Sequence, residues 1–114
     1  MKYVLLNYTK GEPAGERRPR SIDPAVAAVL ERAEVTGWVR LQPGESATTV
    51  TLDSRTVLLT DGPFVDSKDF LGGFIIVEAE NLDGALAVAG EMQELRGSGA
   101  IEIRPVREEP LTGA

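Results

Sequence analysis

The chain has 114 residues, no cysteine, no histidine and a formal net charge of −6 at pH 7. This length predicts a single domain, and the lack of cysteine excludes disulfides, thiolate nucleophiles and zinc–sulfur sites. The lack of histidine excludes catalytic triads built on Ser-His or Cys-His. Any metal site would therefore need oxygen ligands alone, and we expect neither a metal nor an organic cofactor.

The charges are unevenly distributed along the chain. Residues 1–57 carry eight Lys/Arg and seven Asp/Glu, whereas residues 58–114 carry four and eleven. An acidic second half argues against binding to nucleic acid, which needs clustered positive charge. No apolar stretch approaches the ~20 residues that span a membrane, and the opening residues are typical of a strand rather than a signal peptide. We therefore expect a cytoplasmic protein.

The first third of the chain predicts a strand, a long loop and a helix. Residues 2–8 form a strand with apolar side chains on both faces. Residues 9–21 are rich in Gly and Pro and predict a loop. Asp23 and Pro24 predict a helix start, because Asp accepts hydrogen bonds from the first helical amides and Pro loses none there. The helix carries an apolar stripe at Val26, Val29, Leu30 and Ala33. We expect it to end at Gly37.

The middle of the chain predicts four strands. A short strand over residues 38–41 is followed by a hairpin with strands at 47–52 and 56–60. Residues 71–77 are apolar on both faces, which predicts a strand inside the sheet. Gly72 and Gly73 within this strand predict a bulge or a close approach of two backbones.

The last third predicts a second helix, capped by Asn81, and a final strand over residues 100–106. The helix has a predicted apolar stripe at Leu82, Ala85, Leu86 and Ala89. We expect one domain over residues 1–107 and a flexible tail over residues 108–114. The order, β-α-β-β-β-α-β with one extra short strand, predicts an α+β ferredoxin-like sandwich.

The same strands predict a homodimer. Two helices can cover only one face of a four-stranded sheet, yet the strands at 2–8, 56–60 and 71–77 are apolar on both faces. An exposed apolar face of several hundred Å² is rare in soluble monomers. A second copy packed sheet to sheet would cover it. The alternative is a loop folded over the open face.

The sequence resembles the YCII-related family, in its DGPF branch. The resemblance rests on TDGPFVDSK at residues 60–68 and LGGF at 71–74. Further matches lie at residues 1–6, 41–43, 47–50, 82–86 and 101–106. It implies a dimeric α/β barrel of ferredoxin-like protomers, with a cleft between the sheet and the helices. The His-Asp site proposed for the branch that gave the family its name does not carry over, because this chain has no histidine. The connection over residues 37–41 is also shorter than the DGPF branch implies.

The resemblance also implies two possible activities. One relative with this fold is a dehydrochlorinase that acts on a chlorinated aromatic ring. Other DGPF members are encoded beside extracytoplasmic-function sigma factors, which implies an accessory role with a partner in transcription regulation.

Two charged residues of the DGPF block are candidates for a site. Asp61 lies where a strand ends and a Gly-Pro turn begins, so its carboxylate could abstract a proton or bind a cation. The alternative is that it accepts hydrogen bonds from the turn amides. Lys68 could bind an anionic substrate or hold Asp61 ionised, or it could be an exposed lysine between two aspartates.

Aromatic residues and one arginine complete the predicted binding set. The aromatic residues are interpreted either as cleft lining or as core: Tyr3, Tyr8, Trp38 and Phe64. Arg104 could meet an acidic group, although Glu102 on the same strand face is a nearby partner. The basic cluster Arg17, Arg18 and Arg20 is interpreted as a solvated loop, with anion capture at the mouth of a cleft as the alternative.

Three functions remain open from the sequence. The first is a homodimer that binds a small organic molecule near the DGPF turn, with an organic anion as one option. The second is a small lyase or dehydrochlorinase with Asp61 as the base, and the third is a protein-interaction module. A polar pocket with Asp61 turned inward would favour the enzyme. A filled core with Asp61 bonded to turn amides would favour the interaction module.

Overall fold

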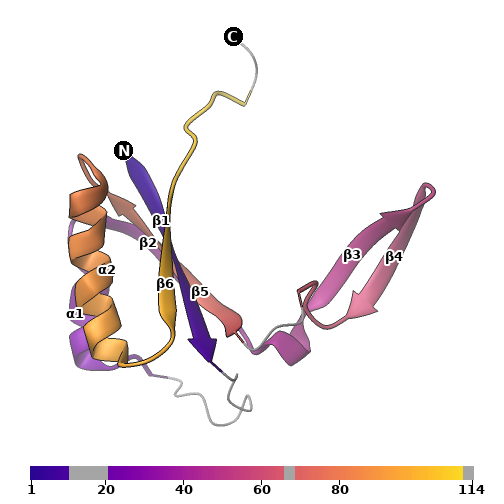
Figure 1. The fold of residues 1–114 in the computed structure, drawn as a ribbon, viewed down its shortest axis with the longest axis horizontal. Coiled ribbons are helices and arrows are strands. Elements are labelled where there is room, and N and C mark those ends of the chain that lie inside the picture. The colour runs from indigo at the N-terminus through magenta and orange to yellow at the C-terminus, as the bar shows by residue number, and fades with distance from the viewer. Residues whose placement is uncertain (11–20, 66–68, 112–114) are drawn as a thin grey trace.

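The computed structural model describes residues 1–10, 21–65 and 69–111 (Figure 1). Within these ranges the elements are β1 (Lys2–Lys10), α1 (Pro24–Leu30), β2 (Val35–Arg40), the 3-10 turn η2 (Gly44–Ser46), β3 (Thr48–Asp53), β4 (Thr56–Asp61), β5 (Asp69–Glu78), α2 (Leu82–Arg96) and β6 (Ala100–Pro105). The predicted basic cluster of arginines, Lys68 and the last three residues lie outside the described residues. Among the helices described, none is long and apolar enough to cross a membrane.

An antiparallel sheet with the strand order β2-β5-β1-β6 forms the centre of the described structure. When β3 and β4 are set aside, the order β1-α1-β2-β5-α2-β6 is that of a ferredoxin-like fold. The predicted α+β, ferredoxin-like fold class is therefore confirmed.

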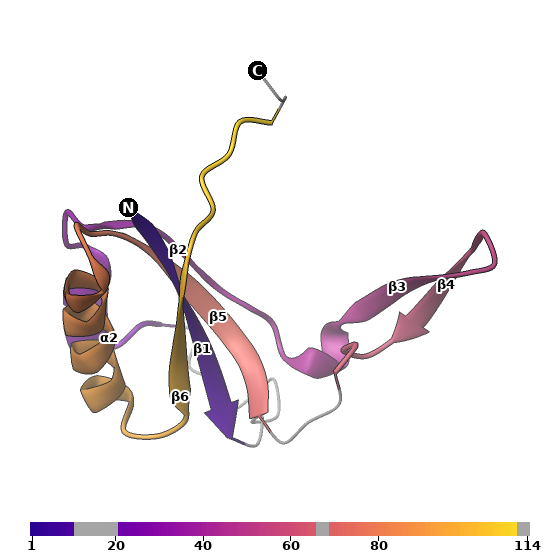
Figure 2. The same cartoon turned by 45° about the horizontal axis from the view of Figure 1, so that its top comes forward.

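The hairpin of β3 and β4 forms a separate two-stranded sheet, inserted between β2 and β5. It stands away from the four-stranded sheet in both views (Figures 1 and 2). The prediction that residues 56–60 contribute to the central sheet was wrong, and β2 takes that place beside β5. Alternating apolar residues identify a strand but not the sheet to which it belongs.

The core lies between the central sheet and the two helices, which cover the same face (Figure 1). Alternation along β1 buries Tyr3 and Leu5 on this face, and β5 adds Ile75 and Val77. The helices contribute Val29, Leu30, Ala85, Val88, Ala89 and Met92.

Both helix starts were predicted correctly, but one helix end was wrong and one apolar stripe was right for only two of its four residues. Asp23 accepts a hydrogen bond from the Ala25 amide at 2.8 Å, and Asn81 accepts one from the Gly84 amide at 3.3 Å. Helix α1 ends at Leu30 rather than at Gly37, because the chain from residue 35 pairs with β5 as a strand. In α2, Ala85 and Ala89 of the predicted stripe are buried in the core, whereas the other two stripe residues, Leu82 and Leu86, are exposed.

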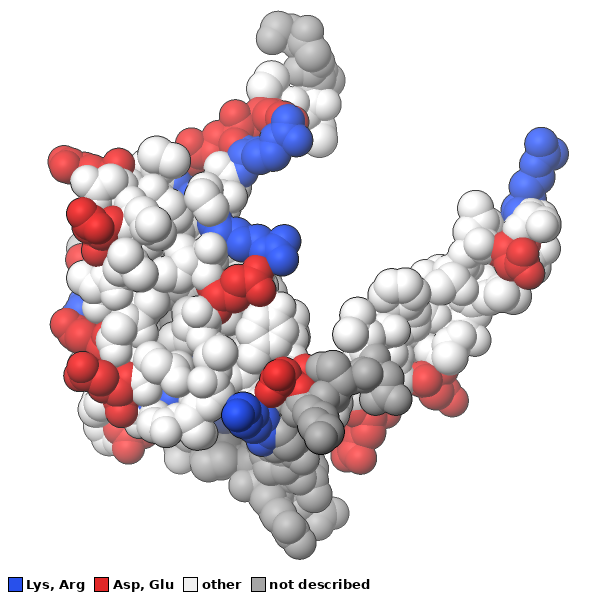
Figure 3. All heavy atoms as spheres, viewed as in Figure 1, with Lys and Arg blue, Asp and Glu red and all other residues white. Residues whose placement is uncertain are grey.

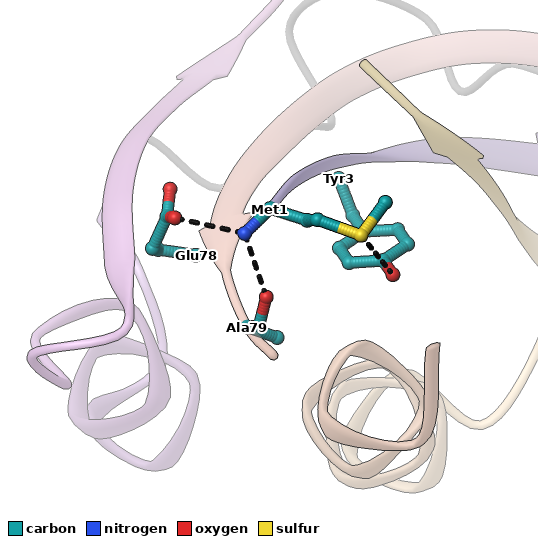
Figure 4. A network of polar contacts seen from close by, with 4 residues as sticks. All are labelled: Met1, Tyr3, Glu78 and Ala79. Carbon is teal, nitrogen blue, oxygen red and sulfur yellow. Dashed lines mark hydrogen bonds and ion pairs between the residues drawn. The ribbon is translucent and has the colours of Figure 1, made fainter. Parts of the chain in front are cut away.

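Polar contacts at the chain start hold β1 beside the end of β5 (Figure 4). The N-terminal ammonium donates hydrogen bonds of 3.0 Å to Glu78 Oε1 and to the Ala79 carbonyl oxygen. The Tyr3 hydroxyl lies 3.8 Å from the Met1 sulfur. Because the Met1–Glu78 pair is exposed, we expect it to contribute at most about 1 kcal/mol.

Candidate functional site

A cleft of about 270 Å³ opens between the sheet and the helices. Its walls come from β1, β2, β5, both helices and the residues just before α1. The apolar part of the wall includes Ile22, Val26, Leu30, Trp38, Ile75 and Met92. The polar part includes Asn7, Arg40 and Arg96. Binding sites for small molecules usually have about 300–1,000 Å³ and a few polar groups in an apolar wall, so this cleft suits a small ligand.

Two glycines shape the floor of this cleft. Asn7 of β1 is opposite Gly73, whereas the next residue, Tyr8, is opposite Leu71, so Gly72 is an extra residue on β5. A Cβ on Gly73 would lie 2.4 Å from the Val39 carbonyl oxygen. The prediction of a bulge or a close approach at these glycines is therefore confirmed, since both occur.

Replacing Gly73 by alanine should destabilise the protein by about 1–3 kcal/mol, because β2 and β5 must separate to admit the methyl group. Urea denaturation would measure this change. Gly90 is a matched control, because it lies within α2 and a Cβ there meets nothing within 4 Å. Gly90→Ala should raise stability by up to about 1 kcal/mol through helix propensity. Equal effects of the two substitutions would contradict the close approach at Gly73.

Asn7 places an unsatisfied acceptor in the cleft wall. Its side-chain oxygen Oδ1 is buried, and within the described part of the chain it accepts no hydrogen bond. A buried polar atom without a partner costs about 1–3 kcal/mol. A hydroxyl or N–H group of a ligand, or a water molecule, would remove that cost.

Arg96 places a partly buried cation in the same wall. Its Nη2 donates to the Tyr8 carbonyl oxygen at 2.7 Å, and its Nη1 donates to Gln93 Oε1 and the Ala100 carbonyl oxygen at 3.3 Å each. These bonds use three of the five guanidinium donors. No ion pair in the described structure involves Arg96. Burial lowers the pKa of Arg96, because partial removal from water disfavours the charged guanidinium.

The other charges of the wall are Arg40 and Asp23. Arg40 is the last residue of β2 and lies opposite Gly73, so it is placed at the same end of the sheet as Arg96. The Asp23 carboxylate is engaged as the cap of α1. The lining of the cleft therefore holds two arginines and one capping aspartate, and guanidinium groups attract anions.

The DGPF turn does not contribute to this cleft, since none of residues 61–64 lines it. Asp61 is the last residue of β4, exposed and opposite Thr48. In the described structure its carboxylate makes no hydrogen bond to the turn, which is held instead by Thr49 Oγ1 donating to the Gly62 carbonyl oxygen at 2.7 Å. Phe64 is 79% exposed and is not a core residue. Lys68 lies outside the described residues.

The remaining predicted binding residues are divided between the two faces of the sheet, and Tyr8 and Arg104 share one face. Tyr3 is buried in the core. Tyr8 and Arg104 alternate to the face of the sheet opposite the helices. Arg104 is hydrogen-bonded to the Glu102 carboxylate, as the alternative predicted, and this contact raises the pKa of Arg104. Trp38, interpreted from the sequence as lining or core, is a cleft residue.

Three polar cleft residues were missed by the sequence reasoning. Asn7 carried a usable signal, because it is the one amide in the apolar run over residues 3–8. Arg96 carried none, because a basic residue in the last helical turn is an ordinary complement to the helix dipole. Arg40 is likewise unremarkable as a charged residue at the end of a strand.

Comparison with known proteins agrees with the fold. The YCII-related domain matches residues 1–110. An uncharacterized protein of Rhizobium meliloti (strain 1021) is 29% identical to this chain over an alignment of 114 residues. The alignment covers 93% of this chain and 92% of that protein. The match to the domain covers nearly the whole chain and includes every helix and strand described above. This chain is a member of the YCII-related family.

Proposed function

We propose that this protein binds a small organic anion in the cleft between the sheet and the helices. The observation that carries the proposal is the partly buried Arg96 guanidinium, without an acidic partner in the described structure, in an apolar wall. A ligand carboxylate would neutralise this charge, and charge-assisted hydrogen bonds are stronger than neutral ones. The unsatisfied Oδ1 of Asn7 favours a ligand that also has a hydroxyl or N–H donor.

The cleft replaces the DGPF turn as the expected binding place. A carboxylate acts as a base near neutral pH when burial disfavours its charged form, and Asp61 is exposed and lies outside the cleft. The geometry therefore favours binding over a lyase reaction with Asp61 as the base. Asp61 does not line this cleft, and within the described residues its carboxylate makes no hydrogen bond with the turn amides.

A thermal-shift series would test this function. The probes are benzoate and 4-hydroxybenzoate, with benzamide as a neutral compound of similar shape. A ligand at 100 times its Kd stabilises the fold by about 2.7 kcal/mol. We expect the carboxylates to raise Tm, the hydroxylated one more than benzoate, and benzamide to have no effect. Equal shifts for benzamide and benzoate, or no shift with either acid, would contradict the proposal.

We also propose that the protein is a homodimer packed through the sheet face opposite the helices. This open face carries Val4, Leu6, Phe74 and Ile76, all partly exposed, together with the Glu102–Arg104 pair. No described helix covers it (Figure 1). Light scattering coupled to size exclusion should give twice the 12.2 kDa chain mass. A monomer at micromolar concentration would contradict the dimer.

A further inference from the structure

The hairpin of β3 and β4, residues 48–61, is an arm that projects from the body (Figure 2). Its strands pair in register over their whole length, from Thr48 opposite Asp61 to Asp53 opposite Thr56. Ser54 and Arg55 form the turn with φ of 46° and 73°, as a two-residue turn that suits the twist of a hairpin requires. The arm is thus a well-formed element rather than an irregular loop.

The two faces of the arm differ in chemistry. The register places Val50 opposite Leu59 and Leu52 opposite Val57, so these four side chains share one face. They are 62%, 71%, 69% and 63% exposed, respectively. The other face carries threonines and a single apolar residue, Leu58. Charged side chains gather at the tip and base of the arm, and the side facing the body is uncharged in Figure 3.

Nothing in the described chain covers the apolar face of the arm. Neither of its strands packs extensively against another helix or strand. The accessible surface of the chain is 8405 Å², whereas a compact monomer of 12.2 kDa would expose about 6,100 Å². The radius of gyration is 16.3 Å against about 13 Å for a compact chain of this length. The difference, about 2,300 Å², includes area on the arm, on the open sheet face and on the extended segment after β6 (Figure 1), and it exceeds the ~800 Å² that one partner contributes to a standard interface.

We infer that the apolar face of the arm packs onto a second copy of this chain, so that two arms are exchanged across the two-fold axis. This inference rests on the proposed dimer. The body and the arm border an open hollow in the space-filling view (Figure 3), and the helices lie on the side of the sheet away from the arm (Figure 1). A partner whose sheet covers the open face would occupy that hollow and contact the arm. Because a two-fold interface is self-complementary, each chain would then cover the arm of the other.

The side chains of the arm favour a second copy of this chain over a charged partner such as nucleic acid. Between the Thr48–Asp61 pair at the base and the tip, its apolar face consists of aliphatic side chains alone. A surface for nucleic acid would need Lys or Arg there. An apolar sheet face offers aliphatic side chains of the same kind, and both the open face and the arm leave such side chains uncovered.

The first test compares two neighbouring leucines on opposite faces of the arm by sedimentation equilibrium. Leu59→Glu places a carboxylate on the apolar face, and Leu58→Glu is the matched control on the threonine face. We expect Leu59→Glu to raise the dimer Kd about tenfold or more, because burial of an unpaired charge is costly. Leu58→Glu should have little effect. If the wild type is a monomer, both the dimer and the arm exchange are overturned. If the wild type is a dimer and the two variants have equal dimer Kd values, the arm exchange alone is overturned.

The second test does not depend on how the charged variants fold. Because the chain has no cysteine, a benzophenone can be attached specifically to the cysteine of the Leu59→Cys variant. This variant, with nitrogen of natural isotopic abundance, is mixed with ¹⁵N-labelled wild type. After re-equilibration and irradiation, we expect crosslinks from the arm to ¹⁵N-labelled peptides of β1 or β5. Leu58→Cys should give far fewer. Crosslinks only within the benzophenone-bearing chain would mean that the arm folds onto its own sheet and would overturn the exchange. A dimer that forms no crosslinks would overturn it as well.

Discussion

Replacing Leu5 by alanine should lower the free energy of unfolding by about 2–5 kcal/mol. Leu5 is fully buried in the middle of β1, paired with Ile75 on one side and Ile103 on the other. The substitution removes apolar contact and leaves a cavity that packed neighbours cannot fill. A domain of this size is stable by only about 5–15 kcal/mol, so the loss is a large fraction of the total.

The measurement is urea denaturation at a fixed protein concentration, since any dimer makes stability depend on concentration. Leu111→Ala is the control, because Leu111 is fully exposed after the last strand and surface changes stay within about 0.5 kcal/mol. A loss below about 1 kcal/mol at Leu5 would show that the core does not lie between the sheet and the helices.

Replacing Arg96 by methionine should weaken the binding of an organic carboxylate by about 10-fold to 100-fold, which corresponds to the loss of one hydrogen bond to a charged group. The substitution removes the partly buried cation of the cleft wall and retains an apolar side chain of similar length. Isothermal titration with 4-hydroxybenzoate would measure the change in Kd. The matched control is Arg107→Met, because Arg107 lies on the exposed segment after β6 and pairs with Glu109.

Stability should separate a binding role from a structural role of Arg96. Burial lowers the pKa of this guanidinium, so the folded state disfavours its charge. That unfavourable contribution is present at every pH below the pKa of arginine, which lies far above neutrality, and so adds no pH dependence near pH 7. In Arg96→Met, removal of the disfavoured charge therefore offsets part of the stability lost with the hydrogen bonds to the Tyr8 and Ala100 carbonyl oxygens. Weaker binding with Tm nearly unchanged is therefore expected, whereas a large fall in Tm with unchanged Kd would contradict the proposed role.

Local chemistry made several features predictable from the sequence. Asp23 and Asn81 cap helices because each accepts from an amide two or three residues ahead. Ser54 and Arg55 close a hairpin whose partners lie within a few residues of each other. The lack of side chains at Gly72 and Gly73 predicted an unusual approach of backbones inside an apolar strand. Each of these signals acts within one element and its immediate neighbours in sequence.

The site was not predictable in the same way, because its parts come from distant segments. Arg96 reaches the Tyr8 carbonyl oxygen, 88 residues away in the chain. Arg40 meets Gly73 through the pairing of β2 with β5. The DGPF block is conspicuous in sequence, yet Asp61 lies at the base of the arm and Phe64, which follows the arm, is exposed. A residue's prominence in the sequence says nothing about which cavity the fold brings it to.

The sequence by itself determined the order of the elements, the N-caps of both helices, the hairpin turn, and an α+β fold with apolar residues on both faces of its strands. These properties depend on neighbouring residues and on the two-residue period of a strand. Only the tertiary structure decided that residues 35–40, rather than 56–60, pair with β5, and that the hairpin leaves the sheet. Strand pairing joins residues that are remote in sequence, and many pairings satisfy the same alternation. The choice among them, and with it the position of the cleft, depends on which packing buries the core against the helices.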